Sequence, residues 1–152
     1  MRAVVQRVKS ASVTVSGNMV GQVGRGFMVL AGVDKGDSDS DVDYIAQKIA
    51  GLRIFPDELD SGKNMSLSIS EIGGSVLMVS QFTLSGDTRK GRRPSFEGAE
   101  EPVKARKLFD ELVDKVKSYG LTVEQGAFGE MMDVALINDG PVTILLDSRK
   151  NF

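Results

Sequence analysis

Apolar and polar residues alternate along the first part of the chain with the two-residue period of a half-buried strand. The alternation predicts strands over residues 2–8 and 11–15, followed by a turn at residues 16–18. The apolar run over residues 27–33 predicts a further, buried strand. We therefore expect the first third of the chain to form mostly sheet.

Two later segments place apolar residues at helical spacing. The first follows an acidic stretch over residues 34–43 and ends at Gly51, and the second begins near Pro102 and stops at Gly120. Their apolar positions are Val42, Ile45, Ala46, Ile49 and Ala50 in the first, and Val103, Leu108, Phe109, Leu112, Val113 and Val116 in the second. Each helix is expected to cover the core with one face.

The remaining periodic segments predict four more strands. One covers residues 75–84 and is followed by a loop rich in glycine and arginine. The others lie near residues 121–125, 130–137 and 142–146. The chain is thus expected to be rich in strands, with two helices.

The predicted fold class is mixed α/β and strand-rich. The economical architecture is two packed sheets with two helices covering one side, in β/β/α layers. A length of 152 residues and a hydrophobic content of 41% suit one compact domain with its own core. Because no repeat, linker or low-complexity tract divides the chain, we expect a single domain over residues 1–152.

The charge of the chain limits how it could bind nucleic acid. The formal net charge is −2. A broadly basic surface holds nucleic acid through many phosphate contacts, so we expect no DNA binding of that kind, and any contact with RNA must be local. The longest apolar run, around residues 27–33, is too short to span a bilayer. A cytoplasmic protein without membrane contact is therefore expected.

Two residue types that carry much of enzyme chemistry are missing. The chain has no cysteine and no histidine, which excludes thiol nucleophiles, histidine triads and imidazole bases. The acidic stretch does not have the spacing of a calcium-binding EF-hand, because the sixth and twelfth positions counted from Asp34 are Asp39 and Ile45 rather than Gly and Glu. We expect neither a metal nor another cofactor.

The segment Ser80-Gln81-Phe82-Thr83-Leu84 gathers two hydroxyls and an amide at the end of a predicted strand. Such a group can border a reacting bond. Strand ends also collect Ser, Thr and Gln simply because the chain is leaving the core. The segment alone does not decide between these interpretations.

The segment Asn138-Asp139-Gly140-Pro141-Val142-Thr143 lies between two predicted strands. Asn, Asp, Gly and Pro favour tight turns for steric reasons, so a turn is one interpretation. A Gly-Pro bond also adopts the cis isomer at small cost, and a cis peptide can fix two neighbouring carbonyl groups in one orientation. A rigid recognition element is the other interpretation.

Four segments together resemble one family. They are Met1-Arg2-Ala3-Val4-Val5-Gln6-Arg7-Val8, Ser80-Gln81-Phe82-Thr83-Leu84, Lys90-Gly91-Arg92-Arg93-Pro94-Ser95-Phe96 and the segment Asn138 to Thr143. In this order they resemble the D-aminoacyl-tRNA deacylase family of the bacterial and eukaryotic type. The resemblance implies an enzyme that hydrolyses the ester between a D-amino acid and the 3′ end of tRNA.

The resemblance implies a homodimer whose selectivity comes from its main chain. The Gly140–Pro141 bond is then cis and reaches from one subunit into the pocket of the other, with its carbonyl groups facing the chiral centre of the substrate. An L side chain would clash with this backbone, whereas a D side chain would point away from it. Glycine has no side chain that could clash. Mischarged glycyl-tRNA is therefore also an expected substrate. The expected substrate-binding residues are Asn138, Gly140, Pro141, Phe128, Gly129 and Met132.

By the same resemblance, Ser80, Gln81, Phe82 and Thr83 border the ester, and backbone amides near Phe82 and Thr83 stabilise the tetrahedral oxyanion. Thr83 as a nucleophile ranks second, because the chain offers no imidazole to activate it. The preferred mechanism lets the vicinal 2′-hydroxyl of the terminal adenosine assist or activate water.

Three further features carry weaker expectations. Arg7 is expected to brace the Gly-Pro backbone, although an arginine near a strand end is usually an exposed charge. A dense basic cluster is formed by Arg89, Lys90, Arg92 and Arg93. The cluster is expected to contact tRNA, through Lys90, Arg92 and Arg93 above all, with a merely solvated loop as the alternative. In the family a small residue often follows the glycine that corresponds to Gly129, whereas this chain has Glu130 there. This departure puts the fine substrate preference in question.

Two rival functions belong to other classes. One is a non-catalytic, dimeric tRNA-binding module, which is weakened because few of the seven Phe and two Tyr lie next to basic residues as stacking platforms require. The other is a general Ser/Thr esterase, which is weakened by the missing base and by the absence of a G-x-S-x-G segment.

Overall fold

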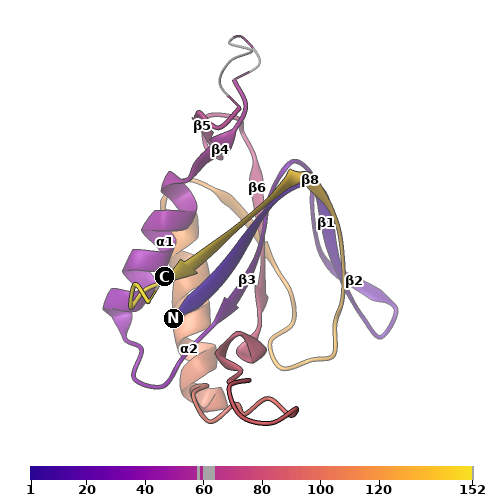
Figure 1. Cartoon of the computed structure of the whole chain (residues 1–152). Coiled ribbons are helices and arrows are strands. Elements are labelled where there is room, and N and C mark those ends of the chain that lie inside the picture. The colour runs from indigo at the N-terminus through magenta and orange to yellow at the C-terminus, as the bar shows by residue number, and fades with distance from the viewer. Residues whose placement is uncertain (58, 60–63, 152) are drawn as a thin grey trace.

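The computed structural model describes residues 1–57, 59 and 64–151, and shows a curved sheet with two helices beside it (Figure 1). The elements in chain order are β1 (Arg2–Val15), β2 (Asn18–Val23), β3 (Gly26–Gly32), α1 (Asp39–Gly51), β4 (Arg53–Phe55), β5 (Leu67–Ser68), β6 (Ser75–Ser80), the 3-10 helix η1 (Phe82–Ser85), α2 (Pro102–Ser118), β7 (Thr122–Gln125) and β8 (Asp133–Asp147). The predicted mixed α/β, strand-rich fold with two helices is confirmed.

Strand β1 organises the main sheet because it pairs with three other strands. Its residues 2–8 pair antiparallel with β3 and its residues 11–15 with β2, while β8 runs antiparallel along its other edge. Strand β6 lies parallel to β3, and β7 lies parallel to β6. The six-stranded sheet therefore has the order β2-β1-β3-β6-β7 with β8 beside β1, and β4 and β5 form a separate ribbon.

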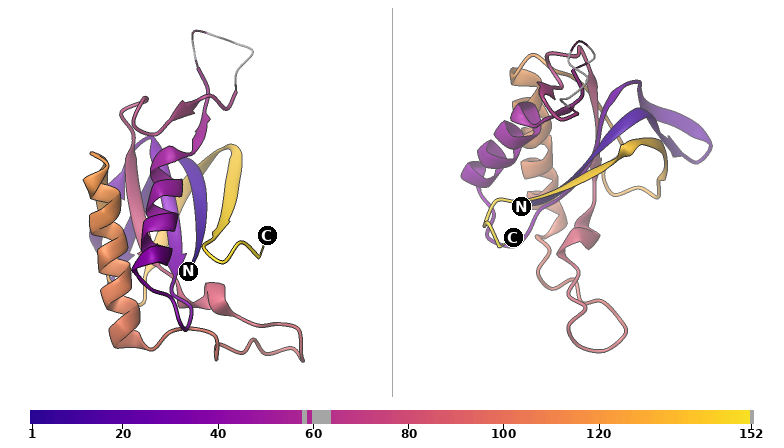
Figure 2. Two further views of the ribbon diagram at one scale, coloured as in Figure 1. Left: turned by 90° about the vertical axis from the view of Figure 1, so that its left-hand side faces the viewer. Right: turned by 45° about the horizontal axis from the view of Figure 1, so that its top comes forward.

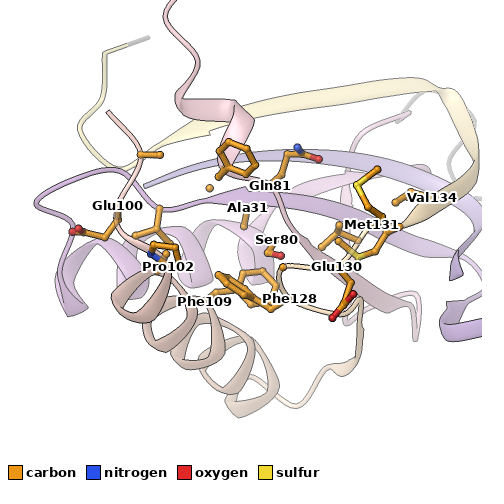
Figure 3. Close-up of a pocket in the computed structure, with 18 residues that line it drawn as sticks. Ala31, Ser80, Gln81, Glu100, Pro102, Phe109, Phe128, Glu130, Met131 and Val134 are labelled. Atoms are coloured by element: carbon orange, nitrogen blue, oxygen red, sulfur yellow. The ribbon is translucent and has the colours of Figure 1, made fainter. Parts of the chain in front are cut away.

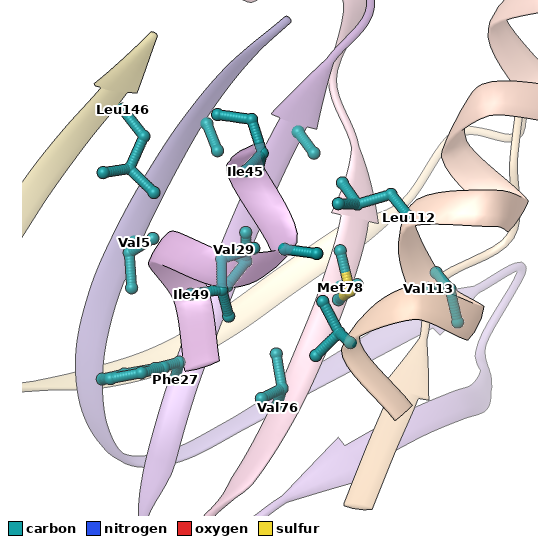
Figure 4. Packing of buried hydrophobic residues seen from close by; sticks show 14 of the residues in the cluster. Val5, Phe27, Val29, Ile45, Ile49, Val76, Met78, Leu112, Val113 and Leu146 are labelled. Atoms are coloured by element: carbon teal, nitrogen blue, oxygen red, sulfur yellow. The ribbon is translucent and has the colours of Figure 1, made fainter. Parts of the chain in front are cut away.

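Side chains of β3 and β6 alternate between the two faces of the sheet, and each face carries an apolar cluster. The larger cluster joins Phe27, Val29 and Met78 to the buried faces of α1 and α2 (Figure 4). The second cluster contains Met28 and Leu77 together with apolar residues of β1 and β2. Both helices lie on the same side of the sheet, as predicted (Figure 2).

The second cluster is enclosed by the sheet itself, because β2 comes back towards β6 and β7. At Gly21 of β2, a Cβ atom would lie 2.8 Å from the carbonyl oxygen of Gln125 and 3.1 Å from a methyl group of Leu77. Two separate packed sheets were expected, whereas the structure has one six-stranded sheet that folds over itself. The reason is the length of β1, which pairs with β3 at one end and with β2 at the other.

Both helices lie where the sequence predicts them. The carboxylate of Asp41 accepts the N–H of Ser38 at 2.9 Å before α1, and the carboxylate of Glu101 accepts the N–H of Lys104 at 3.0 Å in the first turn of α2. One predicted core position is wrong, because Val103 in the first turn of α2 is 78% exposed. No helix in the described part of the chain has both the length and the apolar content needed to cross a membrane.

Several predicted strand boundaries are wrong in an informative way. Strands predicted over residues 130–137 and 142–146 are one strand, β8, which begins at Asp133 and continues through the segment for which a turn was one interpretation. The strand predicted over residues 75–84 ends at Ser80, and the chain then forms η1. Pairing with β1 keeps both sides of residues 138–143 within β8.

Replacing Gly21 with alanine is expected to destabilise the fold by about 1–3 kcal/mol, because the added methyl group would press on the backbone of β7. Urea unfolding measures the effect as a lower midpoint with an unchanged slope. Gly24→Ala is the matched control, since a Cβ there meets nothing within 4 Å. Equal midpoints for the two variants would contradict the close approach of β2 to β7.

Candidate active site

A cavity of about 570 Å³ opens where β6 ends, between the first turns of α2 and the segment that leads into β8 (Figure 3). Six of the expected catalytic and substrate-binding residues line it, namely Ser80, Gln81, Phe82, Phe128, Gly129 and Met132, and Glu130 lines it as well. The cavity lies at the edge of the sheet where the Ser80 segment leaves the core. The structure therefore brings together two predicted groups that are almost fifty residues apart in sequence.

The end of β6 is held against β3 by one further backbone contact. The N–H of Gln81 donates to the carbonyl of Ala31 at 2.8 Å, and this extends the strand pairing by one residue. A Cβ at Gly32 would lie 2.6 Å from the carbonyl oxygen of Gln81, so only glycine allows this approach. The sequence reasoning missed Gly32, because a glycine at a strand end carries no distinctive signal.

The first backbone N–H groups of η1 lie directly after this contact. Phe82 and Thr83 are the first residues of η1, and the first N–H groups of a helix have no acceptor within it. The side-chain amide of Gln81 donates to the hydroxyl of Thr83. Ser80 lies in the middle of the lining residues, between Gln81 and the Phe109–Phe128 pair (Figure 3). The lining next to η1 thus includes the hydroxyl of Ser80 and the side-chain amide of Gln81.

The rest of the cavity wall is mainly apolar. The rings of Phe109 and Phe128 lie with their centroids 6.0 Å apart, and the guanidinium of Arg106 lies 5.3 Å from the centroid of Phe128. Met131 is 91% exposed and Met132 is half-buried, and both lie just before β8. Phe109 was predicted only as a core residue of the helix, and helical spacing alone cannot separate core packing from cavity lining.

Among the described residues, the only ionisable ones that line the cavity are Glu100 and Glu130, and they lie at opposite ends of it (Figure 3). The ammonium of Lys104 contacts the Glu100 carboxylate at 2.8 Å. This hydrogen bond lowers the pKa of Glu100 below its ordinary value and raises the pKa of Lys104. Glu130 is exposed at the rim. Within the described cavity lining, no histidine or lysine is therefore present to act as a base for a hydroxyl group.

Asn138, Gly140 and Pro141 lie on β8 and do not line the cavity of their own chain. The Gly140–Pro141 peptide bond is cis, and Gly140 has φ +125, a conformation that L side chains rarely adopt. The pairing of β8 with β1 is interrupted between Asn138 and Thr143, and we call residues 139–142 the kink of β8. Gly140 lies exposed at the tip of this kink, next to Pro141. The amide oxygen of Asn138 accepts the N–H of Val142 at 2.9 Å, and its nitrogen donates to the hydroxyl of Thr143 at 3.1 Å. The Asn138 side chain thus spans the kink in β8.

Arg7 contacts this kink from the protein interior and is only 8% exposed. Its Nε donates to the carbonyl oxygen of Asp139 at 3.0 Å and lies 3.5 Å from the Asp139 carboxylate, while another guanidinium N–H donates to the carbonyl of Ile54. A Cβ on Gly140 would lie 2.7 Å from Nη2 of Arg7. Arg7 is therefore not the exposed charge that the alternative interpretation described.

The basic loop forms a short hairpin, residues 87–95, closed by two backbone hydrogen bonds of 2.8 and 2.9 Å between Asp87 and Ser95. Arg89 belongs to the basic cluster in sequence, but the structure pairs it with Asp87 through two contacts of 2.9 and 2.6 Å. These hydrogen bonds hold the pKa of Asp87 well below its ordinary value. Lys90, Arg92 and Arg93 are exposed and make no ion pair with any described residue.

Comparison with known proteins decides the family. A family model described as D-Tyr-tRNA(Tyr) deacylase matches residues 4–147. The chain belongs to this D-Tyr-tRNA(Tyr) deacylase family. Membership makes it a hydrolase that acts on an ester bond, as the four sequence segments indicated.

Relatives within the D-Tyr-tRNA(Tyr) deacylase family match over the full chain. A D-aminoacyl-tRNA deacylase of Desulfitobacterium hafniense (strain DSM 10664 / DCB-2) is 56% identical over 152 residues, and all of both chains is covered. A protein of the same description from Clostridioides difficile (strain 630) is 57% identical over 152 residues, again with full coverage of both.

Two solved structures share the fold of this deacylase family member. One, described as c-Myc DNA Unwinding Element Binding Protein, is 39% identical with a TM-score of 0.89, and 97% of this chain and 98% of that chain are covered. The other, described as a probable eukaryotic D-amino acid tRNA deacylase, is 20% identical with a TM-score of 0.79 over 95% of this chain and 97% of that one. The second likeness shows the fold alone.

Arg7→Lys is expected to lower the free energy of unfolding by about 1–3 kcal/mol. Arginine reaches the carbonyls of Asp139 and Ile54 through two separate nitrogen atoms, Nε and Nη1, whereas lysine has a single nitrogen at its end, so we expect one of the two contacts to be lost or lengthened. Urea unfolding measures the loss, with Lys9→Arg on the exposed side of the same strand as the control. An Arg7→Lys variant as stable as the parent chain would show that one of the two contacts contributes nothing.

Proposed function

We propose that the chain hydrolyses the ester between a D-amino acid and the 3′ end of tRNA, rejects L-aminoacyl-tRNA, and also clears mischarged glycyl-tRNA. The observation that carries the proposal is the cavity at the end of β6, which joins the Ser80–Phe82 segment to the Phe128–Met132 segment in a member of this family. Relatives at 55–57% identity are described as D-aminoacyl-tRNA deacylases.

The proposed chemistry relies on positioning and on main-chain hydrogen-bond donors. Phe82 lines the cavity and Thr83 follows it in η1, and we infer that their N–H groups donate to the oxyanion that forms when water attacks the ester carbonyl. The aminoacyl ester is a reactive bond, and its own vicinal 2′-hydroxyl can assist the water. The side chains of Ser80 and Gln81 then orient the ester rather than attack it.

Thr83 as a nucleophile remains the second proposal for the chemistry. Its hydroxyl accepts the amide N–H of Gln81, and the residue is exposed and does not line the cavity. A threonine nucleophile needs a base to take its proton, and the chain contains no histidine. These contacts support a route in which the substrate supplies the assisting hydroxyl.

The proposed chiral filter needs a second copy of the chain. Gly140 and Pro141 lie outside the cavity of their own chain, so they can contribute to a cavity only from a partner. Ile137 and Leu145 on the same strand are 57% and 58% exposed, which supports an apolar surface for a homodimer. In that dimer the carbonyls of the Gly140–Pro141 segment would face the Cα of the substrate and exclude an L side chain.

The tRNA is proposed to contact the hairpin over residues 87–95. Lys90, Arg92 and Arg93 are exposed there and can bind phosphates, whereas Arg89 is engaged by Asp87. The same few cations do not make the broad basic surface that holds duplex DNA, even though one structural relative is described as binding a DNA element. We place the protein in the cytoplasm, where charged tRNA is used.

Matched D-tyrosyl- and L-tyrosyl-tRNA test the selectivity. The D form is expected to be deacylated at least about a hundredfold faster in kcat/KM, because the L side chain would meet fixed backbone. The measurement is loss of acid-precipitable amino acid over time. Equal rates would contradict the filter, and tRNA binding without turnover would favour the non-catalytic module.

The role of Thr83 can be separated from that of the substrate hydroxyl. Thr83→Ala is expected to keep kcat/KM within about tenfold of the parent chain, whereas a substrate ending in 2′-deoxyadenosine should lose about a hundredfold or more. Thr122→Ala, at an exposed threonine of β7, is the control. The nucleophile mechanism would be established instead if the Thr83→Ala variant were inactive and the parent chain hydrolysed the 2′-deoxy substrate at an unchanged rate.

A further inference from the structure

Two phenylalanine rings lie exposed in contact with each other beside the cavity. The ring centroids of Phe82 and Phe96 are 5.2 Å apart at an interplanar angle of 68°, an edge-to-face arrangement. Phe82 is 59% exposed and Phe96 is 37% exposed. Phe27, Phe55 and Phe109 are by contrast buried in the core. The exposed pair is therefore not explained by core packing.

The pair is held in place by the backbone on both sides. Phe82 is the first residue of η1 and itself lines the cavity, and Phe96 directly follows the hairpin over residues 87–95. A Cβ at Gly86 would lie 3.1 Å from an edge carbon of the Phe96 ring, so a glycine makes room for the ring. The hydrogen bonds between Asp87 and Ser95 fix the base of the hairpin.

The hairpin places cations close to the rings. Lys90, Arg92 and Arg93 are exposed and within six residues of Phe96 along the chain, and they make no ion pair with any part of the chain that the structure describes. An extended segment of six residues spans at most about 22 Å. The cations therefore lie within a few nucleotides of anything that contacts the rings.

This combination has the chemistry of a site for single-stranded nucleic acid. Proteins bind single strands by stacking bases on exposed aromatic rings while cations follow the backbone phosphates. The chain has a net charge of −2, so the cations of the hairpin stand out against an acidic background. The sequence alone suggested that few aromatic residues lie where stacking requires, but the fold brings Phe82 against Phe96 at the start of a basic hairpin.

We propose that Phe82 and Phe96 form a stacking platform for a nucleobase in the single-stranded CCA end of tRNA. The proposal rests on the proposed function for its substrate. When the ester lies beside Ser80 and the η1 amides, the base of the terminal adenosine or of the nucleotide before it reaches the rings, and the preceding phosphates reach Lys90, Arg92 and Arg93. The platform positions the RNA, and the main chain of η1 acts on the ester.

Binding can be measured without any turnover. The probe is an uncharged single-stranded RNA ending in CCA, with 2-aminopurine in place of the terminal adenine or of the cytosine before it. Stacking on the platform is expected to quench the fluorescence of one of the two probes, and Phe96→Leu is expected to weaken binding about five- to tenfold, because leucine keeps the apolar volume but has no aromatic face. Phe96→Tyr should bind like the parent chain.

Abasic RNAs and a remote aromatic residue supply the controls. An RNA that lacks the base at the quenched position should bind the parent chain and Phe96→Leu equally. Tyr119→Leu removes a 44% exposed ring at the far end of α2 and should leave binding unchanged. Abasic RNA that binds as tightly as intact RNA, or a Phe96→Leu variant that folds and binds normally, would overturn the platform.

Kinetics on charged tRNA distinguish failure of the platform from failure of the proposed function. Phe96→Leu is expected to raise KM for D-tyrosyl-tRNA about five- to tenfold with kcat changed less than about twofold, since the ring is not at the ester. A parent chain that binds the probes but does not deacylate D-tyrosyl-tRNA would defeat the proposed function while leaving the platform intact. A fall in kcat with unchanged KM would overturn the platform.

Discussion

A buried charge must be satisfied by hydrogen bonds, and in this fold Arg7 meets that requirement with main-chain carbonyls from two distant segments. Its guanidinium donates to Asp139 in β8 and to Ile54 in β4. These contacts join the centre of the sheet, the small β4–β5 ribbon and the kink that carries Gly140. Arg7 contacts β8 at the place where the pairing of β8 with β1 is irregular, and the Asn138 side chain spans the same residues.

Main chain and side chains contribute different parts of the cavity. Close approaches that only glycine permits, at Gly32 and Gly21, fix where β6 ends and where the sheet folds over itself. Aromatic and aliphatic side chains then give the cavity its apolar wall, while the proposed hydrogen-bond donors to the oxyanion belong to the backbone of η1. A chain without histidine or cysteine can build such a site because backbone donors need no ionisable group.

Both helices and the strand-rich class could be predicted from the sequence, because periodicity and capping are local signals. The segments that meet at the cavity were predicted by the family resemblance, since composition alone left the role of Ser80 to Leu84 open. Sequence was insufficient where distant contacts override local preference. Residues 138–143 have the composition of a turn, yet pairing with β1 and the Asn138 side chain keep them within β8. Arg89 pairs with Asp87 only two residues away, a contact that the count of basic residues did not consider. Phe96 carried no signal of its contact with Phe82, since the two rings belong to separate segments of the chain.

The exposed kink of β8 presents peptide groups and a glycine without a side chain at its tip. Substitutions that accumulate on the surrounding surface leave the orientation of peptide groups untouched as long as the supporting arginine and asparagine persist. The shape of the kink is therefore independent of the charge on the surrounding surface.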